Sequence, residues 1–254
     1  MKIQILGCSG GIGAQARTTS ILVDDDILID AGTGVGDLSL EALAKIDHVF
    51  LTHSHMDHVA MLPFLLDTVG SRRHQPVLVH AQEVTLNALR NHLFSGELWP
   101  DFSRIPTPEA PFMRYQALTA GGEVVIDGRR LRSVPMNHIV PAVGYLVSSR
   151  GGSLAFSGDT TTTDEFWQVL NATSDLKHVI IETSFLDEDA ELSRISKHMC
   201  PALAAADIRK LKSGPQVHIT HLMPGSEDEI MTEIARHLPD RAPARLNRGH
   251  IFEL

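Results

Sequence analysis

The chain has 254 residues, of which 43% are hydrophobic, and a formal net charge of −9 at pH 7. This size predicts one domain with a large core, and the acidic excess disfavours binding to a long nucleic acid. No apolar run reaches the roughly 18 residues of a membrane span, and no signal peptide is recognisable, so we expect a cytoplasmic protein that does not contact a membrane. Cys8 and Cys200 are too few for a disulfide framework and are expected to be small buried side chains.

Short β-rich segments open the chain, strands alternating with helical stretches follow, and the second half repeats this scheme. Apolar segments bounded by Gly, Asp or a change of charge predict strands at 2–7, 20–24, 27–30, 48–52 and 76–80. Further strands are predicted at 123–127, 130–136, 143–149, 153–157, 177–182 and 216–220, with helices near 162–171, 201–212 and 226–237. Two similar halves favour two packed sheets covered by helices. The predicted fold is an α/β, four-layer αββα sandwich formed by a single domain over residues 1–254.

A Pro- and aromatic-rich insertion at about 97–122 interrupts this pattern. It contains four prolines and four aromatic residues, namely Trp99, Pro100, Phe102, Pro106, Pro108, Pro111, Phe112 and Tyr115. The prolines exclude a regular helix. Two roles remain open, a lid or substrate wall and a surface insertion packed by its own aromatic side chains. Its apolar surface is also suited to a second subunit, so a homodimer is one expectation.

Four ligand-type residues lie in the six-residue segment after the predicted strand 48–52: His53, His55, Asp57 and His58. Imidazole and carboxylate suit zinc, manganese or iron, and the lack of a nearby cysteine disfavours a closed structural zinc site. Because alternate residues after a strand face opposite ways, this segment can serve two metals at once. Chance histidines on a surface loop are the alternative, but four such residues in six favour a metal site.

The remaining candidate ligands each follow a predicted strand: Asp30, His138, Asp159 and His221. Each one alone is explained equally well as a turn or capping residue. Their common placement favours one shared metal site. Asp159 has two oxygens that can bridge two cations, and Asp30 can hold a ligand loop through hydrogen bonds to it.

Together these residues resemble the ligand set of the metallo-β-lactamase superfamily over nearly the whole chain. Several tracts are also similar to the class II 3′,5′-cyclic-nucleotide phosphodiesterases, at residues 91–102, 182–185, 197–201 and 220–224. The resemblance implies two divalent metal ions, zinc before manganese or iron. It implies a first metal held by His53, His55 and His138, a second held by Asp57, His58 and His221, and Asp159 shared between them.

The same resemblance implies hydrolysis of a small-molecule cyclic nucleotide, cAMP or cGMP, to the 5′-monophosphate by a hydroxide that both metals share. His198 is the candidate that contacts the phosphate or protonates the leaving oxygen, although it can equally be a structural histidine before a helix. Asp57 is expected to assist proton transfer. Glu182, Thr183 and Ser184 end another predicted strand and are candidates for orienting ligands or binding substrate, with a purely structural role equally open.

One departure from the superfamily pattern is Met61, which stands where glycine is usual and is expected to change substrate fit without affecting metal binding. An RNA endonuclease of the tRNase Z type shares the ligands and is the main alternative, but the acidic charge and the lack of a basic arm disfavour it. Hydrolysis of a lactam or thioester is a further alternative. A non-catalytic metal-binding protein is the least favoured, because no ligand is missing.

Overall fold

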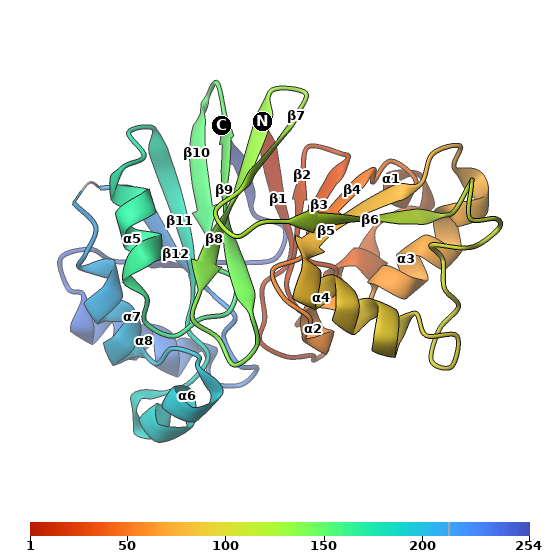
Figure 1. Cartoon of the computed structure of the whole chain (residues 1–254). Coiled ribbons are helices and arrows are strands. Elements are labelled where there is room, and N and C mark those ends of the chain that lie inside the picture. The colour runs from red at the N-terminus through yellow and green to blue at the C-terminus, as the bar shows by residue number, and fades with distance from the viewer. Residues whose placement is uncertain (213) are drawn as a thin grey trace.

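The computed structural model describes residues 1–212 and 214–254, and within them two seven-stranded sheets pack face to face between layers of helices (Figure 1). The first sheet has the order β14 (Ile251–Glu253), β1 (Lys2–Gly7), β2 (Ser20–Val23), β3 (Ile27–Ile29), β4 (His48–Phe50), β5 (Val77–Gln82), β6 (Met113–Leu118). The second has the order β13 (Ala244–Arg245), β12 (Gln216–Thr220), β11 (Leu176–Glu182), β10 (Gly152–Phe156), β9 (Ala142–Ser149), β8 (Arg129–Met136), β7 (Glu123–Ile126). The αββα prediction is confirmed.

Helices cover the outer face of each sheet (Figure 1). Beside the first sheet lie η1 (Thr33–Asp37), α1 (Leu40–Leu43), α2 (Met56–Val59), α3 (Leu62–Val69), η2 (Gly70–Arg72), α4 (Glu83–Ala88) and the π-helical turn η3 (Leu89–Leu93). Beside the second lie α5 (Asp164–Asn171), η4 (Asp187–Asp189), α6 (Ala190–Ser196), α7 (Pro201–Ile208) and α8 (Glu227–His237). Helix α8 is amphipathic, with Ile230 and Ile234 buried one turn apart on the side that faces the core. Acidic residues in its first turn interact favourably with the helix dipole.

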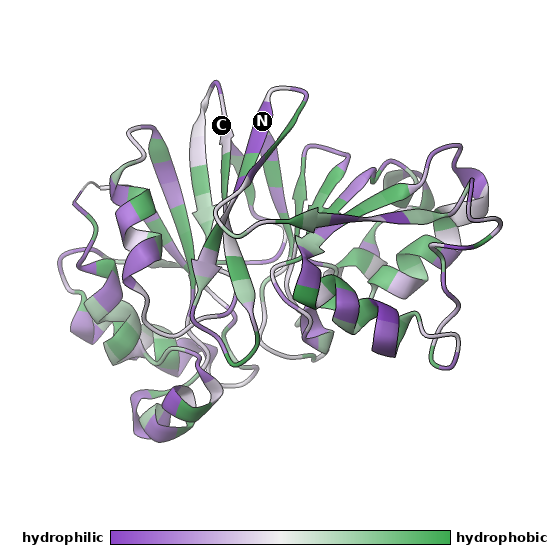
Figure 2. Ribbon diagram, in the orientation of Figure 1, coloured by the Kyte–Doolittle hydropathy of each residue, from purple (hydrophilic) through white to green (hydrophobic). Residues whose placement is uncertain are grey.

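Three apolar clusters fill the spaces between these four layers (Figure 2). The inner cluster lies between the sheets and includes Ile5, Phe50 and Tyr145. Strand β9 is buried along nearly its whole length because it is covered on both faces, which explains its continuous apolar sequence. Within the described part of the chain, no helix combines the length and the apolar composition needed to cross a membrane.

The strand directions bring several loops to one end of the molecule. Strands β3, β4 and β5 are parallel to one another. In the second sheet, β8, β10, β11 and β12 also share one direction, because β9 is antiparallel to both of its neighbours and the strands after it are parallel. The carboxyl ends of these strands therefore converge, as ligand sites in open α/β sheets require.

The insertion at about 97–122 differs from the expectation of a loop throughout. Residues Met113–Leu118 form the edge strand β6, which pairs in parallel with β5 over six residues. The upstream aromatics pack on the outer core cluster of the first sheet, where Phe102 is buried and Trp99 and Phe112 lie against it. The prediction missed β6 because the prolines before it made the whole insertion look irregular, although apolar and polar residues alternate over Met113–Ala117. The short strands β13 and β14 were also missed, because a short edge strand is defined by pairing with its neighbour.

We expect Tyr145→Phe to lower the free energy of unfolding by about 1–2 kcal/mol. The Tyr145 hydroxyl is buried between the sheets and donates to the Leu51 carbonyl at 2.7 Å, so its loss leaves that carbonyl unpaired. Tyr115→Phe is the matched control, because the Tyr115 hydroxyl is buried with no hydrogen-bond partner among the described residues. Urea unfolding of both variants measures the difference, and equal destabilisation would contradict the role of the Tyr145 bond.

Candidate metal centre

The predicted site residues come together where the two sheets end. His53 and His55 follow β4, and Asp57 and His58 lie on the short helix α2. On the second sheet, His138 follows β8, Asp159 follows β10 and His221 follows β12. The seven side chains form two groups in which one donor atom per residue lies within 4.8 Å of the others. These groups are His53, His55, His138 and Asp159, and Asp57, His58, His221 and Asp159.

Asp159 belongs to both groups and turns one oxygen toward each. Its Oδ2 lies 3.6 Å from Nε2 of His53 in the first group. Its Oδ1 lies 3.2 Å from Nε2 of His58 and 3.4 Å from Nε2 of His221 in the second. The side chain is almost fully buried, so this orientation is fixed by packing. A carboxylate arranged in this way is suited to bridging two cations.

Thr52 and Asp30 orient His53, which follows β4, and His58, which lies on α2. Asp30 is fully buried and accepts the Nδ1 proton of His58 at 2.7 Å. The Thr52 hydroxyl donates to Asp30 Oδ2 at 2.8 Å, which leaves its own oxygen to accept from Nδ1 of His53 at 3.0 Å. Both rings therefore present the lone pair of Nε2 toward the site.

The second sheet orients its own histidines in the same way. Nδ1 of His138 donates to the carbonyl of Lys197 at 3.1 Å. Nδ1 of His221 lies 3.0 Å from the Ser184 hydroxyl, which in turn donates to Glu182 Oε2 at 3.1 Å. Each acceptor fixes one tautomer, in which Nε2 carries the free lone pair. His55 instead turns its Nδ1 toward Nε2 of His138, at 3.1 Å.

The donor set fits two divalent cations. Nε2 of His53 and Nε2 of His58 are buried and, among the described residues, have no hydrogen-bond partner. Such orphaned acceptors are costly unless something binds them. The separations of 3.1–3.6 Å among neighbouring donors are also close to the roughly 3.3 Å expected around a tetrahedral zinc with bonds of about 2.05 Å.

The ionisation states suit cation binding. Burial lowers the pKa of His53 well below its usual value, so the ring is neutral at pH 7. Burial opposes ionisation of Asp57, but hydrogen bonds from His221 and His58 outweigh it and hold the Asp57 pKa well below its usual range. Burial also opposes the charged form of His58 and His221, but the neighbouring carboxylates, Asp159 above all, outweigh it and raise the pKa of both rings. The same negative charge favours a cation between these side chains, whose binding requires the two rings to release their protons.

His198 lies beside both ligand groups without belonging to either. Its ring centroid is 4.9 Å from that of His138 and 5.2 Å from that of His221. Nδ1 contacts Glu182 Oε1 at 2.7 Å. Burial lowers the pKa of His198, but the Glu182 carboxylate more than offsets this and raises it to about 9. His198 is thus held as a proton-carrying group at the edge of the site.

The residues predicted to contact substrate have different surroundings. Thr183 is fully buried, and its hydroxyl donates to the Glu182 carbonyl. Ser184 is also buried and orients His221. Met61 precedes α3 and packs against the outer core of the first sheet, with its methyl end near Gly36. The contacts seen for these three residues are structural, and their contact with substrate stays a prediction.

Two residues of this site were missed by the sequence reasoning. Thr52 links Asp30 to His53, and the carbonyl of Lys197 anchors His138. Thr52 directly precedes the histidine cluster, so its position was the available signal. Lys197 contributes a backbone atom from a left-handed conformation, with φ of 54° at the end of α6, and no side-chain pattern encodes that.

Two sheets whose strand ends converge on paired His/Asp groups define a hydrolase of the metallo-β-lactamase fold. A model of the beta-lactamase superfamily domain matches residues 25–240, so the chain belongs to the beta-lactamase superfamily. That fold implies divalent metal ions at this site.

Two similar proteins have names that state different activities. Ribonuclease Z of Bradyrhizobium diazoefficiens is 29% identical over 94% of this chain and 95% of that protein. A protein of Yersinia pestis named as a probable 3′,5′-cyclic-nucleotide phosphodiesterase is 26% identical over 71% of this chain, and the match spans 58% of that protein. The crystal structure of unliganded yeast PDE1 superposes with a TM-score of 0.82 at 17% identity, covering 100% of this chain and 99% of that one, a likeness in fold.

We expect Asp159→Ala to lower bound metal from two ions toward one or none per chain and to reduce turnover to below about 1% of wild type. The variant removes the only side chain common to both ligand groups. Elemental analysis of dialysed protein measures metal content. Asp164→Ala, which removes an exposed carboxylate on α5, is the control. Two retained ions with normal turnover would exclude the bridging role.

Asp30→Asn is expected to weaken metal affinity by about 10–100-fold, because asparagine replaces one of the two acceptor oxygens by an NH2 group, which cannot accept from Thr52 or His58. Asparagine tolerates the left-handed backbone of this position, where φ is 56°, so the substitution tests hydrogen bonding without adding strain. Competition with a chromophoric chelator gives the affinity. Wild-type affinity would mean that packing alone orients His58.

Proposed function

We propose that the protein is a metal-dependent phosphodiesterase that hydrolyses a 3′,5′-cyclic nucleotide, cAMP before cGMP, to the 5′-monophosphate. The observation that carries this proposal is the His198–Glu182 pair at 2.7 Å beside both ligand groups. A ribose 3′ oxygen is a poor leaving group unless it gains a proton, and His198 is placed to supply one.

The side chains divide the work of hydrolysis. Divalent cations held by the two His/Asp groups would lower the pKa of a bound water and neutralise charge on the phosphoryl oxygens. Glu182 holds the His198 ring by Nδ1, which directs the Nε2 proton toward the leaving oxygen. The two carboxylates of the ligand groups are Asp57 and Asp159, and Asp57 is the more exposed. It is therefore the carboxylate placed to take up the proton that the attacking water loses.

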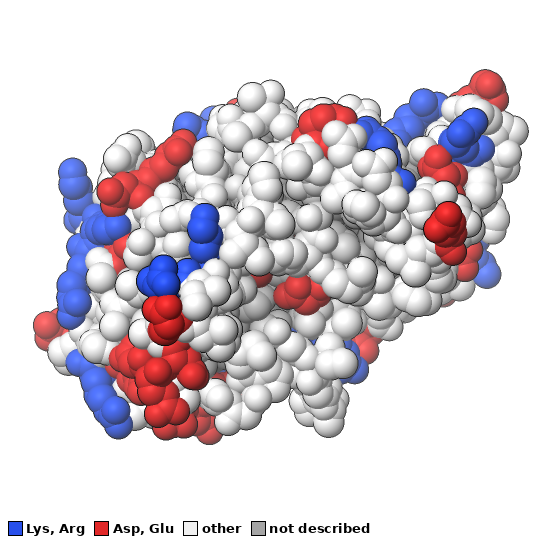
Figure 3. Space-filling model, turned by 60° about the horizontal axis from the view of Figure 1, so that its bottom comes forward, with Lys and Arg blue, Asp and Glu red and all other residues white. Residues whose placement is uncertain are grey.

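The surface around the site supports a small substrate. Figure 3 shows a central hollow that contains an acidic side chain and is surrounded mostly by uncharged side chains, with an acidic group at the lower left. Some basic side chains lie directly above that acidic group, and others lie along the edges of the view. The acidic side chains include Asp187, Glu188, Asp189 and Glu191 of η4 and α6. Met56 and Ile139, which adjoin ligand residues in the sequence, are more than half exposed and offer apolar contacts for a base.

A ribonuclease Z activity is the second candidate, and the Bradyrhizobium relative favours it by covering nearly the whole chain. That alignment runs over 293 positions, whereas 94% of 254 residues is about 239, so about 54 positions of the alignment have no residue in this chain. An RNA endonuclease needs basic contacts to several phosphates. This chain lacks the additional residues of the ribonuclease Z relative and has a net charge of −9. Both features favour a small cyclic nucleotide over an RNA as the substrate.

The deciding experiment follows cAMP by phosphorus NMR with metal-loaded protein, beside a chelator-treated sample. Formation of 5′-AMP that stops with chelator would support the proposal and define which P–O bond breaks. A parallel reaction uses a precursor tRNA with a 3′ trailer. Cleavage of the trailer without conversion of cAMP would reject the proposal in favour of the ribonuclease.

We expect His198→Gln to lower turnover of cAMP by about 10²–10⁴-fold while both metal ions remain bound. The loss should be much smaller with bis(4-nitrophenyl) phosphate, because its leaving group departs without a proton. His92→Gln, on an exposed histidine away from the site, serves as the control. An equal loss on both substrates would assign His198 to positioning and exclude it as the proton donor.

A further inference from the structure

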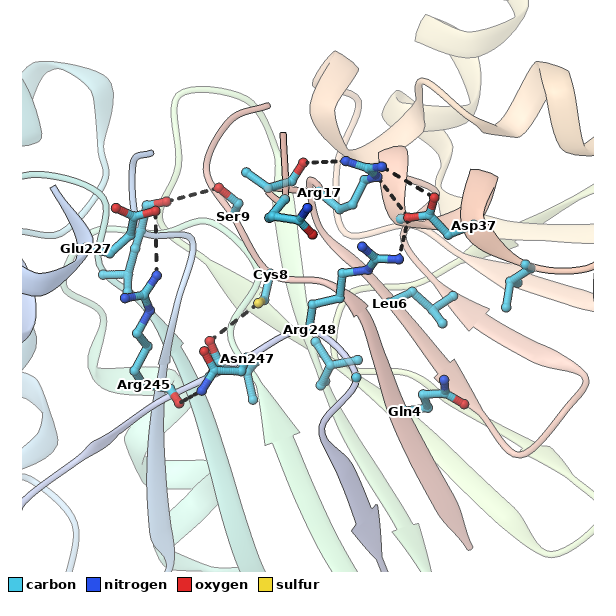
Figure 4. Close-up of a pocket in the computed structure, with 18 residues that line it drawn as sticks. Gln4, Leu6, Cys8, Ser9, Arg17, Asp37, Glu227, Arg245, Asn247 and Arg248 are labelled. Carbon is cyan, nitrogen blue, oxygen red and sulfur yellow. Dashed lines mark hydrogen bonds and ion pairs between the residues drawn. The ribbon is translucent and has the colours of Figure 1, made fainter. Parts of the chain in front are cut away.

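A second cavity, of about 580 Å³, lies between β1 of the first sheet and β13 of the second (Figure 4). This volume is within the range of small-molecule sites. Its walls come from β1, the loop 8–17, η1, Leu222 and the segment 245–249. In the described part of the chain, none of the seven predicted metal ligands lines it, so it is a different site from the metal centre.

One end of this cavity carries an excess positive charge. Arg17 and Arg248 share a single carboxylate, with Nε of Arg17 and Nη2 of Arg248 each 2.8 Å from Asp37 Oδ2. Figure 4 shows these three side chains together at one side. At the opposite side, Arg245 pairs with Asp228 at 2.9 Å and also lies 3.6 Å from Glu227. The Arg17–Arg248 end therefore has one guanidinium more than its carboxylates neutralise, which favours an anion there.

The remaining wall mixes aliphatic side chains with neutral polar groups. Leu6, Leu222 and Leu246 line the cavity and are each nearly buried. Gln4 and Asn247 add neutral hydrogen-bonding groups (Figure 4). A charged end joined to a wall of aliphatic and amide side chains fits a ligand that has an anionic head and a flat part that both packs and hydrogen-bonds.

We propose that this cavity binds a phosphate monoester of the nucleoside monophosphate class, with the phosphate between Arg17 and Arg248 and the base against the leucine wall. Planar guanidinium groups bind phosphate through paired hydrogen bonds, and Arg248 has donors that its contact with Asp37 does not use. The site is independent of the reaction proposed above, since no metal ligand contributes to it.

The cavity wall also contacts the metal centre. The carbonyl of Cys8, on the wall, accepts from the backbone N–H of His221 at 2.8 Å and from the Thr220 hydroxyl at 3.2 Å. His221 itself has a φ of 61°, an uncommon backbone conformation for a residue with a side chain. A nucleotide bound in the cavity would stabilise this wall, and the wall is one hydrogen bond away from His221. Binding in the cavity can therefore regulate the metal centre.

Calorimetric titration of metal-loaded protein with AMP, adenosine and inorganic phosphate tests the proposal. Hydrogen exchange measured by mass spectrometry separates this cavity from the metal centre, because AMP can also bind there. We expect AMP to protect residues 8–17 and 245–249, and adenosine and phosphate to bind less tightly. Protection confined to the segments that carry the metal ligands would overturn the proposal, and equal binding of inorganic phosphate would remove the base from it.

Arg248→Gln is expected to weaken AMP binding to this cavity by at least about tenfold, because one charge-assisted contact to phosphate is lost. Asp37 keeps its contact with Arg17 in this variant, so the fold should be retained. Arg236→Gln, which makes the same change of charge on the exposed end of α8, is the matched control. Unchanged affinity and unchanged protection in Arg248→Gln would exclude the phosphate site.

Discussion

Four of the five histidines in the two ligand groups depend on one constraint: a ring turns its Nε2 lone pair steadily toward a cation when its Nδ1 proton has a fixed acceptor. The fold supplies these acceptors from both sheets. Thr52 accepts from His53, and Asp30 accepts from His58. Ser184 accepts from His221 and itself donates to Glu182. Because each acceptor is buried, the tautomers are set before any cation binds.

The inner core explains why the two ligand groups form together. Each group takes residues from both sheets, and Asp159 of the second sheet completes both. Packing of apolar side chains between the sheets therefore sets the distance across the site. The bond from the Tyr145 hydroxyl to the Leu51 carbonyl ties β9 to the end of β4, two residues before His53. The packing between the sheets therefore also determines the geometry of the metal centre.

The shared metal centre does not by itself select a substrate. The ligand groups suit any reaction in which cations activate water, so they do not separate a cyclic nucleotide from an RNA. The surroundings do differ, with acidic residues on η4 and α6, exposed Met56 and Ile139 beside the ligands, and fewer residues than the ribonuclease Z relative. The Arg17–Arg248 cavity adds a second place where a nucleotide's charge is matched.

The sequence by itself determined the layered fold, most strands and which residues gather at the strand ends, because strand periodicity and ligand chemistry are local properties. It did not determine β13 or β14, since short edge strands are defined by pairing with a neighbour, and the prolines before β6 concealed that strand. Only the tertiary structure decided that Ser184 orients His221, that the Lys197 carbonyl anchors His138, and that Arg17 and Arg248 share one carboxylate. These contacts join residues far apart in the chain or depend on backbone atoms, and no local pattern records either.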